Sequence, residues 1–386
     1  MSSPVDRPVW LKRQTAMRLY RSFVALCIGS TVFLAGCQRT ESVQVGFRGT
    51  GMELVYSPTD LAKAGSMNTI PEPEPVDPPD PEAPQQSEVY KNVQVLNDLT
   101  VLEFSRLMAA MSTWIAPEEG CSYCHNQKNL ASDEKYPKVV ARRMLQMTRQ
   151  INTEWKQHVA DTGVTCWTCH RGQAVPSGDW FKQLEDPAAA RLLGSRFGQN
   201  MPGVTAVANS SLPSDPLSDY LLQAKPIRVQ STQMAPGENR SSVKQAESTY
   251  ALMIYMSQSL GVNCSYCHNT RAFASWAESS PKRGTAWYGI RLVRELNNDY
   301  LTPLTSVLPA NRLSAEGDGP KVGCQTCHKG VYKPLFGVSM LGDYPELAGV
   351  MKDRPAPAAP AATPPAVAMP VVAPGPPATA ASASAS

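Results

Sequence analysis

Apolar residues recur at the spacing of a helix face in the proline-free stretches ahead of four short cysteine-containing segments. In one such stretch Leu107, Met108 and Met111 are separated by the three- and four-residue steps of an amphipathic helix. Strand-like patterns are scarce, and residues 42–50 (SVQVGFRGT) are the segment from which we expect a strand or two. The pattern predicts a mainly α protein of short helices joined by long loops, with little strand.

The chain contains an internal duplication, because two stretches of its first half return in its second half. The first pair is LMAAMSTWIAPEEGCSYCHN (107–126) and LMIYMSQSLGVNCSYCHN (252–269). The second pair is PKVVARRMLQMTRQINTEW (137–155) and PKRGTAWYGIRLVRELNNDY (281–300), and each half then closes with a related segment, CWTCHRG or CQTCHKG. Self-similarity of this kind predicts two halves of like structure. We expect a pseudo-twofold axis to relate them.

Four segments of the form C-x-x-C-H hold four of the five histidines and eight of the ten cysteines. In this motif two thiols on one face of a turn add to the vinyl groups of a haem, and the histidine becomes the proximal iron ligand. A single copy could instead be a redox dithiol, half of a zinc site or part of a disulfide framework, but none of these requires a histidine after every pair. The sequence therefore predicts four covalently bound haems c, each with its iron. The attaching cysteines are Cys121, Cys124, Cys166, Cys169, Cys264, Cys267, Cys324 and Cys327, and the proximal histidines are His125, His170, His268 and His328.

Haems that carry electrons usually have both axial positions filled, by His/Met or by His/His pairs. Methionine must supply most of the sixth ligands here, because a single histidine, His158, lies outside the four motifs. Three M-x-x-M pairs are suitable, since a three-residue step puts both side chains on one face of a helix. Ordinary core packing would account for one member of each pair. The residues alone leave open which member ligates: Met108 or Met111, Met144 or Met147, Met253 or Met256.

The duplication leaves one haem without a methionine. When the repeats are aligned at RQINTEW and RELNNDY, Met144 falls opposite Gly289, so the second half has no methionine at that place. The imidazole of His158 is the remaining ligand, and it would have to reach from the first half to the haem of His328. With every iron six-coordinate, the pattern favours electron transfer and not a substrate-transforming enzyme. Nearby arginines are expected either to pair with haem propionates or to lie on solvated helix faces: Arg142, Arg143, Arg291 and Arg294.

Charge and the N-terminal pattern place the protein at a membrane surface outside the cytoplasm. The formal charge of +3 comes from residues 1–36, which hold five basic residues and one acid, and the near-neutral remainder gives no sign of nucleic-acid binding. Basic residues lead into an apolar run of 13 residues, Phe23–Ala35, which suits a signal peptide and is short for a membrane span. The run ends in LAGC, a bacterial lipobox, so Cys37 is expected to carry a lipid anchor; an uncleaved anchor helix is the alternative. With Cys27 lost in the signal peptide, no thiol is then left for a disulfide.

These features divide the 386 residues into six parts. The proline-dense acidic residues 71–84 should run extended, and the chain from residue 354, nearly all Ala, Pro, Val, Thr and Ser, should be disordered. The expected parts are a signal peptide with lipobox (1–36), an N-terminal extended segment with the proline-rich acidic linker (37–95), a first dihaem half (96–175), a connector (176–245), a second dihaem half (246–345) and an Ala/Pro-rich disordered tail (346–386).

Together these residues resemble the tetrahaem cytochrome c subunit of purple-bacterial photosynthetic reaction centres. The resemblance covers roughly residues 37–345 and rests on the two motif pairs, the spacing from methionine to motif, the histidine ahead of the second motif and the lipobox. QVGFRGTGM (44–52) and SLPSDPLSDYL (211–221) also look like segments of that family. The resemblance implies the axial pairs Met108 with His125, Met144 with His170, Met253 with His268, and His158 with His328. The choice of the first methionine in each pair rests on the resemblance alone, whereas His158 also follows from the residues.

The same resemblance implies a location and a function. The protein would sit on the periplasmic face of the bacterial inner membrane, lipid-anchored at Cys37 and bound to the core subunits of the reaction centre. It would take electrons from a soluble periplasmic carrier, either a cytochrome c or a high-potential iron–sulfur protein, and re-reduce the photo-oxidised bacteriochlorophyll special pair. The alternative is a lipid-anchored multihaem electron carrier that feeds a periplasmic reductase. Such proteins usually favour bis-histidine ligation, for which this chain has too few histidines.

Overall fold

The structure is a computed structural model that describes five stretches of the chain, all within the unit formed by residues 1–354: 41–45, 52–76, 82–182, 211–229 and 242–349. The expected signal peptide (1–36), the lipidation site Cys37 and the tail beyond residue 349 lie outside the described residues. Among the described helices, none combines the length and the apolar composition needed to cross a membrane.

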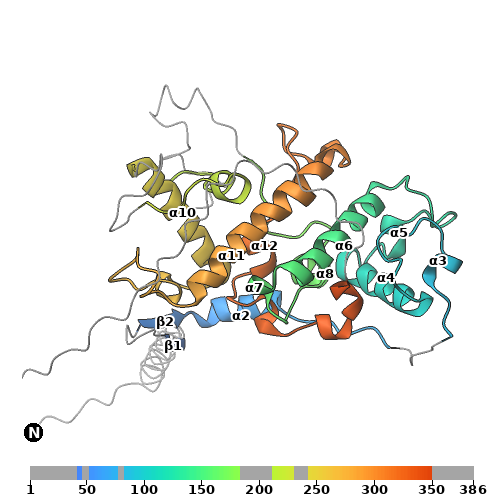
Figure 1. Ribbon diagram of the computed structural model, residues 1–386, viewed down its shortest axis with the longest axis horizontal. Coiled ribbons are helices and arrows are strands. Elements are labelled where there is room, and N and C mark those ends of the chain that lie inside the picture. Colours follow the sequence, from blue (N-terminus) through green and yellow to red (C-terminus); the bar gives the residue numbers. More distant parts are fainter. Residues whose placement is uncertain (1–40, 46–51, 77–81, 183–210, 230–241, 350–386) are drawn as a thin grey trace, which may run out of the picture. The chain divides into compact units, whose positions relative to one another are not determined.

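Helices and loops make up most of the described chain (Figure 1). The four longest helices are α4 (Val101–Ile115), α6 (Tyr136–Glu154), α10 (Val243–Leu260) and α11 (Lys282–Glu295). Each C-x-x-C-H motif begins a single short turn: α5 (Cys121–Cys124), α8 (Cys166–His170), the 3₁₀ turn η2 (Cys264–Tyr266) and α12 (Cys324–His328). The prediction of a mainly α protein of short helices is confirmed.

Strand structure in the described residues is limited to one antiparallel pair. β1 (Glu41–Val45) pairs with β2 (Met52–Tyr56), with Val43 opposite Leu54. This confirms the expectation of a strand in residues 42–50 for its first four positions, and residues 46–51 lie outside the described part. The remaining elements are α2 (Pro58–Met67), α3 (Gln86–Val89), α7 (Lys156–Val159), the π-helical η1 (Ser218–Leu222) and η3 (Leu296–Leu301), and the 3₁₀ turns η4 (Thr302–Ser306), η5 (Ala310–Arg312), η6 (Pro334–Gly337), η7 (Leu341–Asp343) and η8 (Pro345–Ala348).

Local signals in the sequence set the ends of the long helices. α4 begins at a capping box, in which the Thr100 side chain accepts from the backbone N–H of Glu103 at 3.3 Å and the Glu103 carboxylate accepts from the N–H of Thr100 at 2.9 Å. These bonds satisfy N–H groups that have no partner inside the helix. α10 ends at Gly261, whose φ of +62° is the left-handed conformation that favours glycine.

The C-terminal described segment packs against the first half of the chain. Leu335, Met340, Tyr344 and Leu347 share one buried cluster with Trp114 of α4 and with further apolar residues of the first half. The Tyr344 and Trp114 rings meet edge to face at 4.6 Å between centroids. Residues expected to finish the second half, or to form the tail, therefore complete the core of the first.

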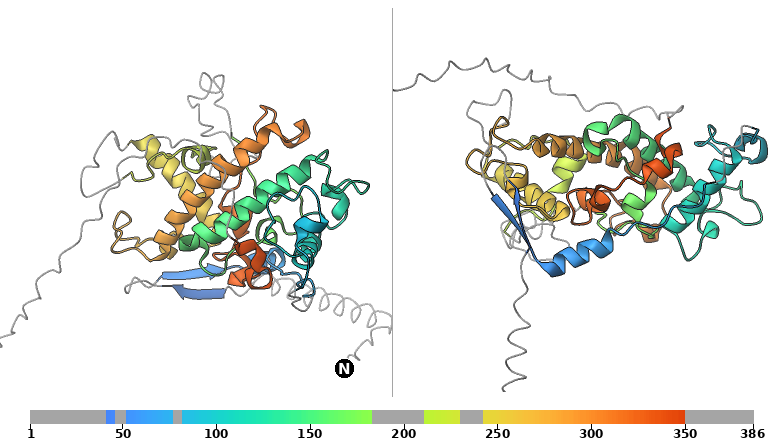
Figure 2. Two further views of the ribbon diagram at one scale, coloured as in Figure 1. Left: turned by 45° about the vertical axis from the view of Figure 1, so that its right-hand side comes forward. Right: turned by 90° about the horizontal axis from the view of Figure 1, so that it is seen from below.

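Two further clusters build the second half and join it to the first. Tyr220 and Leu221 of the connector pack with Leu252 of α10 and Ile290 of α11. A third cluster brings Ile151 of α6 together with apolar residues of α11 and η3. Helices α6 and α11 accordingly lie side by side (Figures 1 and 2).

The internal duplication is visible in a repeated hydrogen-bond pattern. Asn152 accepts from the N–H of Val164 at 2.7 Å and donates to its C=O at 2.9 Å. Asn297 makes the same two bonds with Val322, both at 2.9 Å. Each valine stands two residues before the first cysteine of the closing motif of its half. An asparagine amide can satisfy both backbone groups of one residue, so it fixes the chain just ahead of the motif.

The described part of the proline-rich linker forms neither helix nor strand. Over residues 71–76 its backbone is held by side chains, because Arg106 donates to the carbonyl oxygens of Glu74 and Pro75 and the N–H of Glu74 donates to Tyr344 Oη. The linker thus runs across α4 and the C-terminal segment.

Candidate haem-binding sites

Each of the four motif histidines is oriented by its own loop. In every case Nδ1 lies within hydrogen-bonding distance of a backbone carbonyl three or five residues further on: His125 with Leu130 at 3.0 Å, His170 with Gln173 at 2.8 Å, His268 with Phe273 at 3.3 Å and His328 with Val331 at 2.9 Å. A carbonyl can only accept, so Nδ1 must carry the proton and Nε2 keeps its lone pair. Metal-bound histidines are usually arranged this way.

The backbone entering the second and fourth motifs is built alike. The hydroxyl of Thr168 accepts from the N–H of Thr165, and the hydroxyl of Thr326 accepts from the N–H of Gly323, each at 2.9 Å. Each bond links the threonine inside the motif, on turn α8 or α12, to the residue just before the first cysteine. The two cysteines of each motif are then presented from one short rigid turn.

Residues from all four motifs line one cavity of about 380 Å³ with mostly apolar walls. The second cysteines of all four motifs, and the histidines of the second and fourth, contribute to its wall. Apolar residues of α6 and α11 form much of the rest. The motif cysteines and histidines in the lining are Cys124, Cys166, Cys169, His170, Cys267, Cys324, Cys327 and His328. A large apolar space bordered by four such motifs suits flat apolar macrocycles that are bound through sulfur and imidazole.

His158 and His328 face each other across this cavity. Their ring centroids are 6.1 Å apart. An iron bound at about 2 Å by a nitrogen of each ring would place the centroids roughly 6 Å apart, so this pair fits an intervening haem iron. His158, on α7, directs Nδ1 to the carbonyl oxygen of Thr285 on α11 at 2.9 Å, which leaves its Nε2 available.

Burial keeps these imidazoles neutral. It lowers the pKa of His158 and, together with the neighbouring His158, lowers the pKa of His328 to about 4. Burial likewise lowers the pKa of His170. A neutral imidazole has the lone pair that a metal needs.

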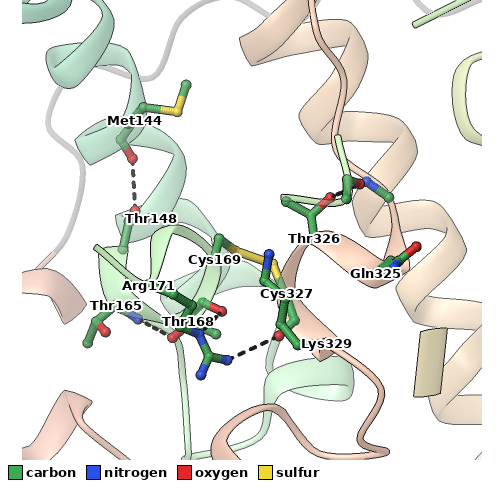
Figure 3. The surroundings of a disulfide bond; sticks show 12 residues. Met144, Thr148, Thr165, Thr168, Cys169, Arg171, Gln325, Thr326, Cys327 and Lys329 are labelled. Carbon is green, nitrogen blue, oxygen red and sulfur yellow. Dashed lines mark hydrogen bonds between the residues drawn. A yellow bond between two sulfur atoms is a disulfide. The ribbon is translucent and has the colours of Figure 1, made fainter. Parts of the chain in front are cut away.

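The methionines predicted as sixth ligands do not all lie in the same surroundings. Met144 lies on α6 (Figure 3), and it is among the residues that line the cavity. In the other two pairs the second member, Met111 or Met256, is among the residues that line the cavity, and the first member, Met108 or Met253, is not. All four pack in the neighbouring apolar clusters. The family-based choice of Met108 and Met253 therefore stays a prediction.

The arginines considered as partners of haem propionates all have protein partners. Arg142 pairs with Asp133 at 2.7 Å, Arg143 donates to the carbonyl oxygen of Asp299, Arg291 lies over the Trp287 ring at 4.5 Å, and Arg294 donates to the carbonyl oxygen of Tyr220 at 2.9 Å. Arg142 thus serves a loop of the first half, and Arg294 ties the connector to α11.

Two features of the site were not identified from the sequence. One is the carbonyl oxygen of Thr285 that orients His158; every residue has such a backbone group, so the sequence cannot mark it. Asn152 and Asn297 matched in the repeat alignment, but nothing in that alignment said what they bind.

Cys169 and Cys327 form a disulfide, with their Cα atoms 4.4 Å apart (Figure 3). The expectation that no thiol is left for a disulfide concerns the haem-loaded protein and stays a prediction; in this structure turns α8 and α12 contact each other and bring these two sulfurs together. Arg171 strengthens this contact by donating to the carbonyl oxygen of Cys327 at 3.4 Å. A sulfur cannot be in a disulfide and in a thioether at once, so haem attachment at these two cysteines stays a prediction.

Comparison with known proteins identifies relatives over most of the chain. The family described as photosynthetic reaction centre cytochrome C subunit matches residues 36–348. The cytochrome c subunit of the photosynthetic reaction center of Rubrivivax gelatinosus is 47% identical over 351 residues, which cover 90% of this chain and 93% of the relative. That of Thermochromatium tepidum is 48% identical over 326 residues, covering 84% and 79%. Cytochrome c-554 of Chloroflexus aurantiacus is a more distant relative, 27% identical over 267 residues, covering 57% and 64%.

Proposed function

The chain belongs to the family of photosynthetic reaction centre cytochrome c subunits, and from this premise we propose that it feeds electrons through four haems to the photo-oxidised special pair. It is an electron-transfer cytochrome with covalently bound haem c, and its place is with the reaction centre at a membrane. The alternative of a carrier for a periplasmic reductase is not favoured, because three of its relatives are reaction-centre subunits. The number of haems, their ligands, the donor and the anchor are the parts we propose.

The single observation that carries the proposal is the facing pair His158 and His328. Their 6.1 Å separation suits one iron, and each ring has its Nδ1 occupied by a carbonyl. A catalytic haem needs an open position, whereas two histidines on one iron fill both axial sites. We therefore assign the protein a carrier role and no substrate-transforming site.

The chain's own residues would divide the work at each haem. The paired cysteines would hold the macrocycle, the motif histidine would bind the iron with an orientation fixed by its loop carbonyl, and Met108, Met144, Met253 or His158 would fill the sixth position. The bound haem supplies reversible one-electron chemistry. The apolar residues of the cavity wall would keep water from the macrocycles, and methionine ligation would raise the potentials of three haems relative to bis-histidine ligation.

Cys169 and Cys327 need a specific assignment, because thioether and disulfide exclude each other. We assign both sulfurs to haem in the loaded protein. Because α8 and α12 contact each other, the second and fourth haems would then be attached at adjacent points of the fold.

The partners and the location complete the proposal. A soluble cytochrome c or a high-potential iron–sulfur protein in the periplasm would be the donor, and the core subunits of the reaction centre would bind the protein. Lipidation of Cys37 would hold it on the periplasmic face of the inner membrane, since stable anchoring takes more than one acyl chain.

Flash absorbance on membranes that contain this protein tests the function. Haems reduced beforehand should be oxidised after a flash, and the signal should disappear when Cys264 and Cys267 are both replaced by serine. The same membranes with haems oxidised chemically before the flash are the control, and they should give no haem signal. A protein with four reducible haems but no flash-induced oxidation would refute the proposed donor role.

A further inference from the structure

We propose that Gly289 is the residue that selects His158 as the sixth ligand of the haem at His328, by leaving out a side chain where the other half of the molecule has Met144. This inference deepens the proposed function and rests on it. Gly289 is a positioning residue, because it acts through His158.

The space beside Gly289 is filled by the His158 ring. A methyl group added at Gly289 would lie 2.5 Å from Cε1, 2.9 Å from Nδ1 and 3.1 Å from Nε2 of His158, and these are its three nearest neighbours. Carbon atoms in contact normally stay about 3.5–4.0 Å apart. Any side chain at this position would therefore have to move the imidazole.

The ring has little freedom to move. Its Nδ1 is tied to the carbonyl oxygen of Thr285, which stands one turn before Gly289 on the same helix α11. Residues four apart lie on the same face of a helix. Thr285 thus binds the ring and Gly289, one turn later on α11, leaves the space that the ring fills. His158, Thr285 and Gly289 all line the cavity.

Gly289 occupies the place in the second half that Met144 occupies in the first. Asn152 stands eight residues after Met144 and binds Val164, and Asn297 stands eight residues after Gly289 and binds Val322 in the same way. The spacing fixes the register of the two helices relative to their closing motifs. Met144 and Gly289 both border the cavity.

The consequence is a ligand choice made by one residue. A methionine at 289 would present its sulfur where Met144 presents its own, and it would exclude the imidazole from the other half. With glycine at 289 the imidazole of His158 has room, and histidine becomes the sixth ligand of the haem at His328. Histidine in place of methionine lowers the potential of a haem, so residue 289 also sets the potential of the haem at His328 relative to the other three.

The test uses the complete haem-loaded protein and two spectroscopic readouts. Bis-histidine ligation is followed by the low-spin electron paramagnetic resonance signal, and His/Met ligation by the weak long-wavelength sulfur–iron absorption band. Gly289→Ala should abolish the bis-histidine signal and leave the sulfur band and the haem content unchanged. Gly284→Ala is the matched control on the same helix, because a methyl group there meets nothing within 4 Å, and it should leave both readouts unchanged.

A second variant keeps the inference testable if Gly289→Ala fails to fold. In His158→Ala/Gly289→Met the ring is gone and the methionine of the repeat is restored. The sulfur band should grow by about one third, as expected when a fourth His/Met haem joins three, and the lowest potential should rise. A double variant with an open sixth position would overturn the inference.

The outcomes separate this inference from the proposed function. Wild-type protein with four haems but no bis-histidine signal would refute the ligand set of the proposed function, and this inference with it. Wild-type protein with that signal, together with Gly289→Ala protein that retains it unchanged, would refute the role of Gly289 alone.

Discussion

Arg149 should be the most important charged side chain for stability among those described, and replacing it by methionine tests this. Its side chain is buried, with 1% of the residue exposed, on the inner face of α6. It donates two bonds of 2.9 Å to the Asp98 carboxylate, one of 3.0 Å to the carbonyl oxygen of Glu346 and one of 3.2 Å to that of Val95. The guanidinium therefore ties α6 both to the segment before α4 and to the C-terminal segment.

The expected loss follows from these partners. Hydrogen bonds to charged groups contribute about 1.5–3 kcal/mol each and an orphaned buried carbonyl costs about 1–3 kcal/mol. The Asp98 side chain is 33% exposed, so water can replace part of what the arginine supplied. We expect Arg149→Met to reduce the free energy of unfolding by about 3 kcal/mol, and Asp98→Asn, which leaves the carbonyl bonds intact, by about 1 kcal/mol.

Urea unfolding of the haem-loaded protein, followed by far-ultraviolet circular dichroism, measures both losses. Lys156→Met is the control, because Lys156 pairs with Asp161 at 3.2 Å while the side chains are 59% and 97% exposed, and it should change nothing measurable. The reasoning is refuted if Arg149→Met is as stable as this control.

Three further predictions concern charge, sulfur and the anchor. Hydrogen bonding to Arg142 holds the pKa of the Asp133 carboxyl below its ordinary value, so the ionised carboxylate stabilises the fold above about pH 4 and this contribution is lost as the pH falls further. Asp133→Asn should therefore reduce the fall in melting temperature at acid pH. A melting temperature that falls as steeply as in the wild type would contradict this. Intact mass should show four haems and no mass gain on reduction, whereas a gain of two hydrogens would mean that Cys169 and Cys327 stay in a disulfide. Expressed without the core subunits, Cys37→Ser should move from the membrane to the soluble fraction, and retention on the membrane would favour the uncleaved helix.

The approach of His158 to His328 shows how far the sequence could lead. The absence of a methionine opposite Met144, and the single histidine outside the motifs, were enough to predict that His158 reaches toward His328. The structure brings those two rings 6.1 Å apart. Motifs and internal repeats can be recognised in a single sequence, because each is defined by residues at short, fixed spacings.

Other parts of the site depend on partners far along the chain and left no such signal. Arg142 pairs with Asp133, nine residues before it, and nothing in the sequence indicated this ion pair. Arg149 lies on the same helix as Arg142, yet it is buried, because it binds the carboxylate of Asp98 and the carbonyl oxygen of Glu346 from two other segments. Which arginine is buried is decided by packing between segments up to 197 residues apart, and no local pattern encodes that.

The return of Leu335, Met340, Tyr344 and Leu347 to the core of the first half has a consequence for the order of maturation. A chain is delivered with its N-terminus first, so the first two C-x-x-C-H motifs emerge long before the residues that close the core around them. If haem is attached at these motifs as proposed, attachment would not have to wait for that core to close. Residues 335–347 close the core of the first half, so their deletion should destabilise the first half of the protein more than the second.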